Sequence, residues 1–395
     1  MTTCFGICVQ TIVLAIIRPY YWSAYRVRSW GRLPWRRGSM LVLCNHQHDL
    51  DTNVTIIQMQ LQGPWNRPIY SAGSRRMFEP GFMAVRVPWL RSYLRRLDAT
   101  KLFTQLGILP IENELYTRAL ASLAWWVYVA HDEVPLGKVF PPDVLARLDP
   151  QAATVTVGQL FAKRWFKPAQ HTRVSIKRLL EPYRSEIIAE TRAHLEPDYH
   201  RLEVALRAGN TMFLTPEGKY SRDGRMARLR SALMRLLPLA EQIYLLAVSY
   251  DSFVGRRLSV LFRILAPPDP NDLESSMRAP RPVTTSQLLG SWIFEGQHAS
   301  FTRAQAMAGI RVRLDSLPPG AFVDPKLRKS PERMTLAALN GLVRLGIFEN
   351  HSDEFRATSL RRHPQFPFVD DVIEYQSNFL NETVVALERL AGRRS

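Results

Sequence analysis

Cysteine is scarce in this chain, whose 395 residues contain only three: Cys4, Cys8 and Cys44. The number is odd, and two of the three lie in one apolar run near the N-terminus, so no disulfide framework is indicated. The simplest expectation is a protein in a reducing compartment.

Acidic residues are absent from positions 1–48, although the whole chain contains 35 of them. The same stretch carries arginines interleaved with Tyr and Trp: Arg18, Tyr20, Tyr21, Trp22, Tyr25, Arg26, Arg28, Trp30, Arg32, Trp35, Arg36 and Arg37. Such side chains suit a membrane interface, where aromatic rings lie at headgroup depth and cations meet anionic lipid. We therefore predict that residues 1–38 associate with a phospholipid surface, peripherally or monotopically, on the cytoplasmic face.

A long hydrophobic run is also missing from the N-terminus. The apolar stretch from Cys4 to Ile17 is interrupted by Gln10 and is shorter than the roughly 20 residues of a spanning helix. We expect it to dip into one leaflet, and an ordinary buried first helix is the alternative. A secretory signal is not expected, because no basic residue precedes the run and no small-residue cleavage site follows it.

Positive charge dominates, with a formal net charge of +17. This excess favours an anionic partner, which could be a phospholipid surface, a nucleic acid or a phosphorylated substrate. The length and the 46% hydrophobic content allow a large core, so we expect two domains or one large domain with an appendage.

Short apolar runs separated by helix-length segments predict an α/β domain with a mainly parallel sheet flanked by helices. The predicted strands are Met40–Cys44, Ile69–Ala72, Ile108–Ile111, Met212–Leu214 and Tyr244–Val248. We place this domain at residues 39–265. An aromatic-rich stretch at about 114–206 has a helical pattern and is predicted to be a helical insertion, either a wall for an acyl chain or a peripheral elaboration.

The proline-rich segment Ala266–Asp272 predicts a linker, because consecutive prolines suit neither a helix interior nor a central strand. Residues 273–395 then form a C-terminal module. Its pattern of a helix at Arg333–Leu345, a strand at Ile347–Phe348, a polar turn and a strand at Phe355–Ala357 resembles the end of a winged-helix domain, an α+β fold. A final amphipathic helix carries Ile373, Ser377, Leu380, Val384 and Leu387 on one face.

The first candidate for chemistry is the loop Asn45–Asp51, which follows a predicted strand at the edge where open α/β sheets present side chains to ligands. Asp51 can bond one ring nitrogen of His46 and fix its tautomer, so that the other nitrogen acts as a base toward a hydroxyl. The structural alternative is a histidine that caps the next helix.

A second loop, Phe213–Arg225, also follows a predicted strand and combines a carboxylate, two glycines and three cations. Glycine allows close approach of the backbone to a ligand, and the cations could hold a phosphate. The candidate substrate-binding residues are Asn45, Glu217, Gly218, Lys219, Ser221, Arg222 and Arg225. A solvated basic turn is the alternative.

Together the two loops resemble the glycerolipid acyltransferase superfamily, whose members acylate lysophosphatidate or glycerol 3-phosphate. The family's first motif, His, four residues, then Asp, is matched by His46 and Asp51. Its third motif is matched by Thr215–Ser221, with the common continuation Arg-Asp-Gly-Arg at Arg222–Arg225. The resemblance covers roughly residues 35–265.

The resemblance implies an O-acyltransferase of phospholipid biosynthesis. It would take acyl-CoA or acyl carrier protein as donor and a lysolipid or glycerol phosphate as acceptor, without a cofactor or metal. His46 and Asp51 would be catalytic. Asn113 and Tyr220 stand where the family pattern has phosphate-binding arginines, and Leu246–Val248 lacks the proline of the fourth motif, so the acceptor stays open.

Three alternatives remain. His46, His48, Asp49 and Asp51 crowd together as in some dinuclear metal hydrolases, but such sites need further histidines at other strand ends. The winged-helix resemblance and the net charge allow nucleic-acid binding, yet cations and acids are mixed in that module. The third is an inactive relative that binds lipid without chemistry.

Overall fold

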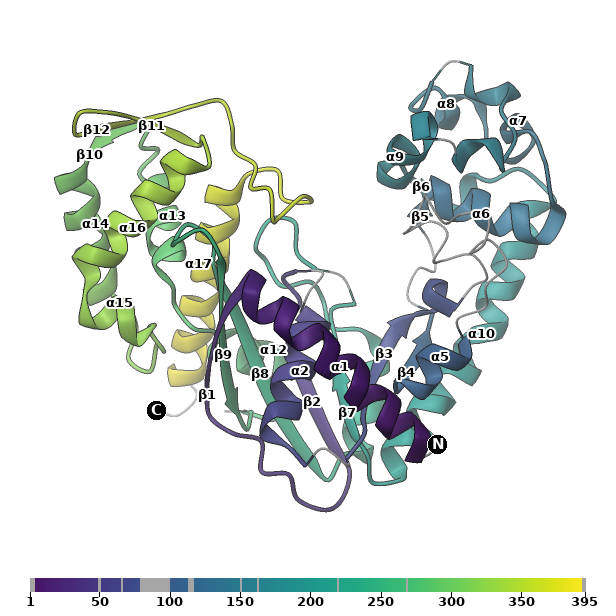
Figure 1. Cartoon of the computed structure of the whole chain (residues 1–395), viewed down its shortest axis with the longest axis horizontal. Coiled ribbons are helices and arrows are strands. Elements are labelled where there is room, and N and C mark those ends of the chain that lie inside the picture. Colours follow the sequence, from purple (N-terminus) through teal and green to yellow (C-terminus); the bar gives the residue numbers. More distant parts are fainter. Residues whose placement is uncertain are drawn as a thin grey trace. The chain divides into compact units, whose positions relative to one another are not determined.

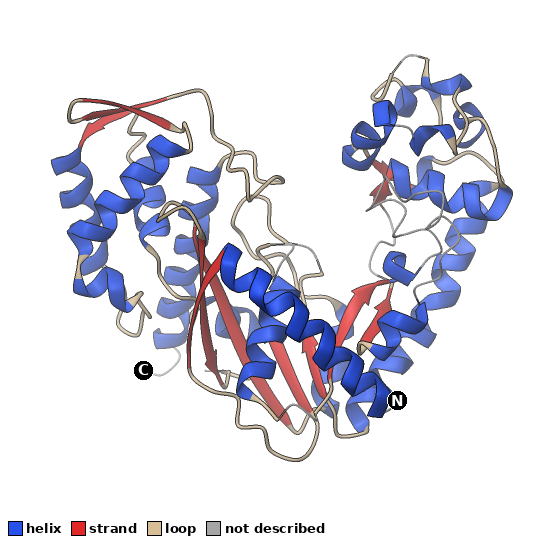
Figure 2. Ribbon diagram, in the orientation of Figure 1, coloured by secondary structure: helices blue, strands red, loops and turns tan. Residues whose placement is uncertain are grey.

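The computed structural model describes residues 4–48, 51–64, 67–78, 100–112, 117–149, 151–161, 163–218, 220–267 and 269–392. The fold is mixed α/β, with a seven-stranded, mostly parallel sheet, flanking helices and two small antiparallel sheets (Figures 1 and 2). The predicted α/β class with a mainly parallel sheet is therefore confirmed.

The main sheet has the strand order β1-β9-β8-β2-β7-β3-β4. Its strands are β1 (Tyr25–Trp30), β2 (Met40–Cys44), β3 (Ile69–Ser74), β4 (Ile108–Ile111), β7 (Thr211–Leu214), β8 (Gln242–Asp251) and β9 (Leu258–Leu265). All five predicted strands are present. Strand β2 pairs in parallel with both β7 and β8, which brings the ends of the two candidate loops to one edge of the sheet.

Two strands of the main sheet, β1 and β9, were not predicted from the sequence. Strand β9 runs antiparallel to β8, to which a short loop joins it, and antiparallel neighbours need only such a short connection. Strand β1 pairs in parallel with β9. Its residues belong to the basic-aromatic segment, so a part of that segment is built into the sheet.

Strand β2 is buried on both faces, as expected for a central parallel strand. Met40, Val42 and Cys44 point into one apolar core, and helix α2 (Asp51–Gln62) covers this face with Val54, Ile56, Ile57 and Met59. The loop between β2 and α2 is thus held at both ends by buried elements.

Helix α1 (Cys4–Ala24) extends beyond the apolar run expected from the sequence. Leu14 and Ile17 pack against the sheet core, and the buried side chain of Gln10 bonds both the backbone N–H and the carbonyl of Ile69. The stretch Gly6–Ala24 is long and apolar enough to cross a membrane, a property that signal sequences and core helices share.

The chain divides into two compact units: Met1–Gly6 with Tyr70–Ala205, and Ile7–Ile69 with Leu206–Ser395. The first unit contains most of the predicted insertion, which is largely helical. Its elements are η1 (Arg75–Phe78), α5 (Thr100–Gln105), β5 (Thr117–Ala119), α6 (Leu120–His131), α7 (Leu136–Val139), α8 (Pro142–Leu145), η3 (Ala152–Thr154), η4 (Gln159–Phe161), α9 (Lys163–His171), β6 (Arg173–Ser175), η5 (Ile176–Arg178) and α10 (Tyr183–Arg207). Residues between Leu120 and Ile187 form a separate apolar core there.

The second unit continues from β7 through the C-terminal module. Its further elements are α11 (Ser231–Leu236), η6 (Leu237–Leu239), α12 (Leu273–Arg278), α13 (Thr285–Glu295), β10 (Ser300–Thr302), α14 (Arg303–Asp315), α15 (Pro325–Lys329), α16 (Pro331–Arg344), β11 (Phe348–His351), β12 (Glu354–Ala357) and α17 (Val372–Gly392). Capping boxes begin α13 and α14, where Thr284 and Thr302 each exchange hydrogen bonds with a glutamine three residues on.

The predicted linker ends where α12 begins, with Asp272 as its N-cap. The apolar core nevertheless runs from the sheet into the C-terminal module without interruption, since Val248 and Phe253 belong to the same cluster as Leu288, Leu339 and Phe355. The expected domain boundaries stay a prediction, and the sheet and the module share one core.

Candidate active site

His46 and Asp51 meet in the loop that follows β2. The Nδ1 atom of His46 lies 3.0 Å from Oδ2 of Asp51. The same carboxylate oxygen accepts the backbone N–H groups of Gln47 at 2.5 Å and His48 at 2.7 Å. Asp51 is fully buried, whereas the His46 side chain is 14% exposed. The buried carboxylate thus orients the His46 ring through Nδ1, while part of the ring stays accessible to solvent.

Tyr250 completes the surroundings of Asp51. Its hydroxyl, at the end of β8, donates a hydrogen bond to the other carboxylate oxygen, Oδ1. Burial and the nearby Asp51 charge raise the pKa of Tyr250 well above its ordinary value, so the hydroxyl keeps its proton and acts as a donor. Tyr250 was not predicted to belong to the site. The sequence shows it as a tyrosine just beyond the predicted strand Tyr244–Val248, which is a weak indication of such a role.

Cys44 is the last residue of β2 and lies close to this pair. It is fully buried, and its thiol is within 3.8 Å of the Thr55 hydroxyl. Burial and the Asp51 charge raise the pKa of the Cys44 thiol well above its ordinary value, and a protonated thiol is a poor nucleophile. His46 is therefore the reactive group that this loop presents.

Asn45 fixes the loop to the neighbouring strand. Its side-chain amide donates to the carbonyl of Val248 at 3.0 Å and accepts the N–H of the same residue at 2.8 Å. The side chain is buried, and both ends of its amide are engaged. Asn45 was predicted to bind substrate, and in the structure it positions the histidine loop.

Glu217 joins the two candidate loops. One carboxylate oxygen accepts the backbone N–H of His46 at 2.7 Å, and the other accepts the N–H of Ala227 at 2.9 Å. Burial raises the pKa of Glu217 to about 7, although Arg281 and these two N–H groups act in the opposite direction. Glu217 lies beside His46 as predicted. Its carboxylate links the two loops, because it bonds backbone N–H groups on both sides.

A narrow cleft with about 150 Å³ of empty space, too tight to admit a water molecule, lies beside His46. It is lined by Asn45, His46, Gln47, Glu217, Ser221, Gly224, Arg225, Met226, Arg281 and Phe379. Arg281 and Phe379 come from the C-terminal module, and the Arg281 guanidinium lies 4.3 Å over the Phe379 ring. Nothing in the sequence connected these two residues with the site, because they lie beyond the part of the chain that carries the motifs.

Of the remaining predicted substrate-binding residues, some line the cleft beside His46 and others do not. Ser221 and Arg225 line the cleft, and the N–H of Ser221 bonds the carbonyl of His46 at 3.3 Å. Gly218 has a φ of +66°, which an L side chain rarely adopts, and it shapes the turn. Arg222 is exposed and is not among the lining residues, and Lys219 lies outside the described residues.

Tyr220 stands at a position where an arginine was expected from the resemblance. Its ring is perpendicular to the His46 ring, with 5.7 Å between centroids, and it also contacts Phe368 at 5.1 Å. The second position, Asn113, lies outside the described residues. An aromatic ring thus lies beside His46 where the resemblance predicts a cation.

The C-terminal module contacts both candidate loops directly. The Tyr375 hydroxyl donates to the carbonyl of Gln47 at 3.4 Å, and Nε2 of His48 lies 2.5 Å from the carbonyl of Gln365. Asn378 donates to the carbonyl of Asp223 at 2.8 Å. The module therefore buttresses both loops.

Among the described residues, no three His, Cys, Asp or Glu side chains are grouped so that they could hold a metal ion. Asp49, one member of the metal alternative, lies outside those residues. In the described part of the histidine loop, the His48 ring packs against the rings of Phe366 and Tyr250, whose centroids lie 5.2 and 5.4 Å away.

The fold and the site together define an α/β protein with a buried-carboxylate and histidine pair at the end of a parallel strand, an arrangement suited to general-base chemistry. The sequence matches no protein-family model, and comparison with proteins of curated function gives no match.

Proposed function

We propose that the protein is an O-acyltransferase that moves a fatty acyl group from an acyl thioester to a hydroxyl of a glycerolipid precursor. The observation that carries this proposal is the 3.0 Å contact between His46 and Asp51 at the tip of β2, with Glu217 clamping the histidine backbone. These are the residues at which the sequence resembles the glycerolipid acyltransferase superfamily.

In the proposed reaction, Nε2 of His46 takes the proton of the acceptor hydroxyl as its oxygen attacks the thioester carbonyl. The tetrahedral intermediate collapses with cleavage of the carbon–sulfur bond, and the imidazolium returns the proton to the departing thiolate. Asp51 stabilises the imidazolium, and the products are an ester and a free thiol. The protein itself carries no acyl group at any step.

The C-terminal module supports a refinement of this proposal. Its order of α13, β10, α14, α16 and the β11–β12 hairpin, with β12 between β10 and β11, is that of a winged helix, which we propose as its fold. In a winged helix that reads DNA, the helix before the hairpin enters the groove. Here a Cβ added to Gly341 of α16 would lie 1.7 Å from the carbonyl oxygen of Phe253. The side of α16 that carries Gly341 is therefore packed against the turn after β8. The contact fastens α16 to this turn, which favours a bracing role for the module.

The test is an acceptor panel. Purified protein is incubated with a labelled long-chain acyl thioester of coenzyme A or acyl carrier protein, and with lysolipids, glycerol 3-phosphate or uncharged alcohols. The proposal expects labelled ester and an equal amount of thiol with at least one hydroxyl acceptor. Release of fatty acid to water with every acceptor, or no thiol release at all, would contradict the proposal.

A further inference from the structure

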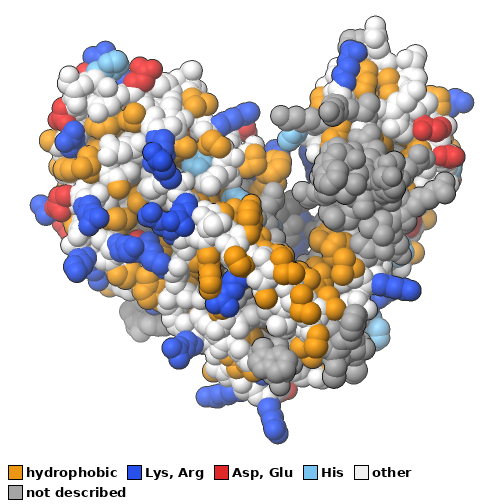
Figure 3. All heavy atoms as spheres, viewed as in Figure 1, with side chains coloured by type: hydrophobic (Ala, Val, Ile, Leu, Met, Phe, Trp, Pro, Cys, Tyr) orange, Lys and Arg blue, Asp and Glu red, His pale blue; other side chains and the backbone are white. Residues whose placement is uncertain are grey.

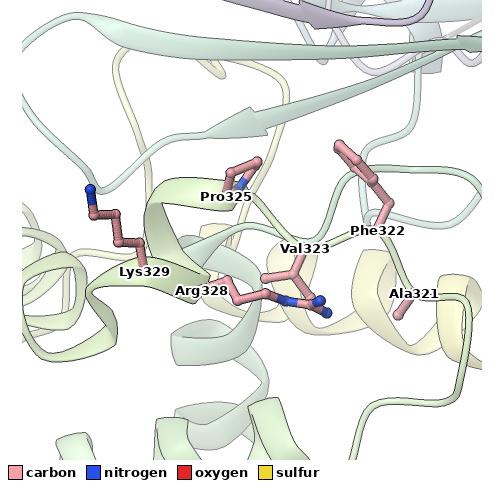
Figure 4. A pocket seen from close by; sticks show the side chains of 6 residues that line it. All are labelled: Ala321, Phe322, Val323, Pro325, Arg328 and Lys329. Carbon is pink, nitrogen blue, oxygen red and sulfur yellow. The ribbon is translucent and has the colours of Figure 1, made fainter.

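A groove of roughly 410 Å³ lies at the start of α15, away from the histidine site. Its lining residues are Ala321, Phe322, Val323, Pro325, Arg328 and Lys329. All six belong to α15 and the loop that leads into it, and the Arg328 guanidinium extends along this loop toward Ala321 (Figure 4). The Lys329 amine points the other way in this view, so Arg328 is the cation that faces the apolar lining residues.

The floor of the groove is fixed by residues from two strands of the sheet. The Phe322 ring lies 5.1 Å from the Trp30 ring, and the Arg263 guanidinium lies 4.7 Å over the Phe322 ring. Asp324, the acidic residue next to the groove, is buried and accepts two hydrogen bonds from Arg28, at 2.5 and 2.7 Å. Its negative charge is therefore compensated internally and does not offset the groove's cations.

Helix α15 supplies a concentrated positive charge. Three of its five residues are exposed cations: Lys326, Arg328 and Lys329. The structure shows no ion pair between any of the three and another described residue. A partner of opposite charge from outside the chain is the natural complement of such a site.

Helix α1 adds an exposed apolar stripe to the same compact unit. Ile12, Ile16 and Tyr20 are 58%, 70% and 64% exposed, and their spacing of four residues places them on one side of the helix. The helix leads directly into β1, which reaches the groove through Arg28 and Trp30.

Figure 3 shows an apolar area and a basic area in the same view of the molecule. Hydrophobic side chains gather over α1, and Lys and Arg side chains gather over the neighbouring helices of the C-terminal module. An apolar helix that lies in a membrane interface binds more firmly when a basic patch meets anionic headgroups beside it.

We propose that the α15 groove binds the phosphate-bearing headgroup of an anionic phospholipid in a membrane on which the exposed stripe of α1 lies. The inference extends the proposed membrane-associated function but does not need the catalytic step. It assigns a lipid contact to the C-terminal module, whereas the sequence placed all membrane contact in residues 1–38.

The test is co-sedimentation with vesicles of phosphatidylcholine alone and with vesicles to which phosphatidylglycerol is added. The groove variant is Lys326→Gln/Arg328→Gln/Lys329→Gln. The matched control, Lys138→Gln/Arg147→Gln/Lys177→Gln, removes the same charge from three exposed positions of the other unit. A third variant, Ile12→Ser/Ile16→Ser, alters the apolar stripe.

Phosphatidylglycerol should raise the affinity of the wild-type protein for vesicles. The groove variant should bind vesicles that contain phosphatidylglycerol about ten- to hundredfold more weakly than the wild type, while still binding phosphatidylcholine vesicles. The stripe variant should bind both vesicles poorly. An unchanged groove variant, or an equal loss in the charge-matched control, would overturn the inference.

Two further arms separate the possible explanations. Groove-dependent binding of duplex DNA without groove-dependent vesicle binding would assign the site to nucleic acid and overturn the lipid assignment. Acyl transfer to a soluble acceptor in detergent is measured on the same proteins, so that a failure of the proposed catalytic function is visible separately. Wild-type protein that lacks transfer but shows groove-dependent vesicle binding would contradict only the enzymatic proposal.

Discussion

The Asp51 carboxylate accepts hydrogen bonds from the His46 ring, the backbone of Gln47 and His48, and the Tyr250 hydroxyl. Three of these bonds end on Oδ2 and one on Oδ1, so both carboxylate oxygens are held inside the protein. Such a carboxylate cannot rotate without losing several bonds at once. It therefore holds the imidazole in one orientation, which a general base requires.

Removing the Tyr250 hydroxyl should weaken this orientation. We expect Tyr250→Phe to lower kcat of acyl transfer about ten- to hundredfold with little change in KM, because a hydrogen bond to a charged group contributes about 1.5–3 kcal/mol. Steady-state kinetics on the best acceptor of the panel measures both constants.

Tyr375→Phe is the matched control for that experiment. Tyr375, in α17, is as fully buried as Tyr250 and also bonds the histidine loop, but its hydroxyl reaches the carbonyl of Gln47, at 3.4 Å, and not the Asp51 carboxylate. The control should stay within about threefold of the wild-type kcat, as expected for a long, uncharged hydrogen bond. Equal losses in the two variants would mean that Tyr250 acts through general packing.

Glu217 predicts a pH dependence of stability. Because its pKa is raised from 4.5 to about 7, the folded protein holds a proton that the unfolded chain releases between these values. The unfolded state then binds fewer protons, so the free energy of unfolding falls as pH rises through this window. Denaturant titrations at several pH values should show a shallower fall for Glu217→Gln.

Asp251 provides the comparison for that titration. Burial raises the pKa of Asp251 from 3.8 to about 6, so Asp251→Asn should flatten the same fall over a lower pH window. If Glu217→Gln leaves the slope near neutral pH unchanged, the carboxyl is ionised in the folded protein throughout, and the proposed effect of its burial is wrong.

At the scale of elements, the carboxylate of Glu382 holds α17 against the end of the second candidate loop. Glu382 accepts the backbone N–H of Met226 at 2.8 Å and pairs with Arg281 at 3.2 Å. Arg281 is fully buried, and burial lowers its pKa, while Glu382 and Glu217 act to raise it. The guanidinium is thus held between carboxylates from two parts of the chain.

Breaking this pair from one side should be costly. We expect Arg281→Met to lower the free energy of unfolding by about 1–3 kcal/mol, because the half-buried Glu382 carboxylate then keeps only its longer contact with Arg278, at 3.7 Å. The double variant Arg281→Met/Glu382→Gln should recover part of the loss, since the weakened carboxylate charge is also removed. Urea denaturation of both single variants and the double variant measures the coupling, and additive losses would contradict a direct interaction.

The predicted elements near the motifs are confirmed because their sequences carry strong local signals. Met40–Cys44 is apolar throughout and ends at polar loop residues, which fits only a buried strand of that length. Strand β1 was not predicted, because its arginines and aromatic residues also suit a membrane surface. Its pairing with β9 depends on tertiary contacts that the local sequence does not show. Helix α16 was predicted almost to its ends, since Pro331 begins it and Gly346 follows it.

For the site, the sequence could predict contacts within a loop but not those made across the fold. The His46–Asp51 pair was predicted from spacing, and Glu217 was correctly placed near it. The roles of Asn45 and Glu217 as backbone clamps depend on which N–H groups lie opposite them, which spacing does not encode. Arg281 had no local signal, because only folding brings the C-terminal module to the cleft.

At the scale of the whole molecule, the sheet and the C-terminal module depend on each other. Phe253 after β8, Leu288 of α13 and Leu342 of α16 are all fully buried in one cluster. Ending the chain at Leu265 would expose much of this core. We expect such a protein to lack cooperative unfolding and to bind a hydrophobic dye, as measured by near-ultraviolet circular dichroism and dye fluorescence.

A truncated chain that stays soluble and unfolds cooperatively would contradict that expectation. It would show that the module is an independent domain, as the proline-rich Ala266–Asp272 segment suggested. The same preparation, if folded, would also reveal whether the loops around His46 keep their geometry without α17.

The central claim is that His46, oriented by Asp51, removes the proton of the acceptor hydroxyl. Its most direct test compares acyl-transfer rates of wild-type protein, His46→Ala and the exposed hairpin control His351→Ala under identical conditions. We expect the acyl-transfer rate of His46→Ala to be about 10²- to 10⁴-fold lower than that of the wild type. His351→Ala should keep the wild-type rate. A folded His46→Ala protein that retains more than about a tenth of the wild-type rate would contradict it.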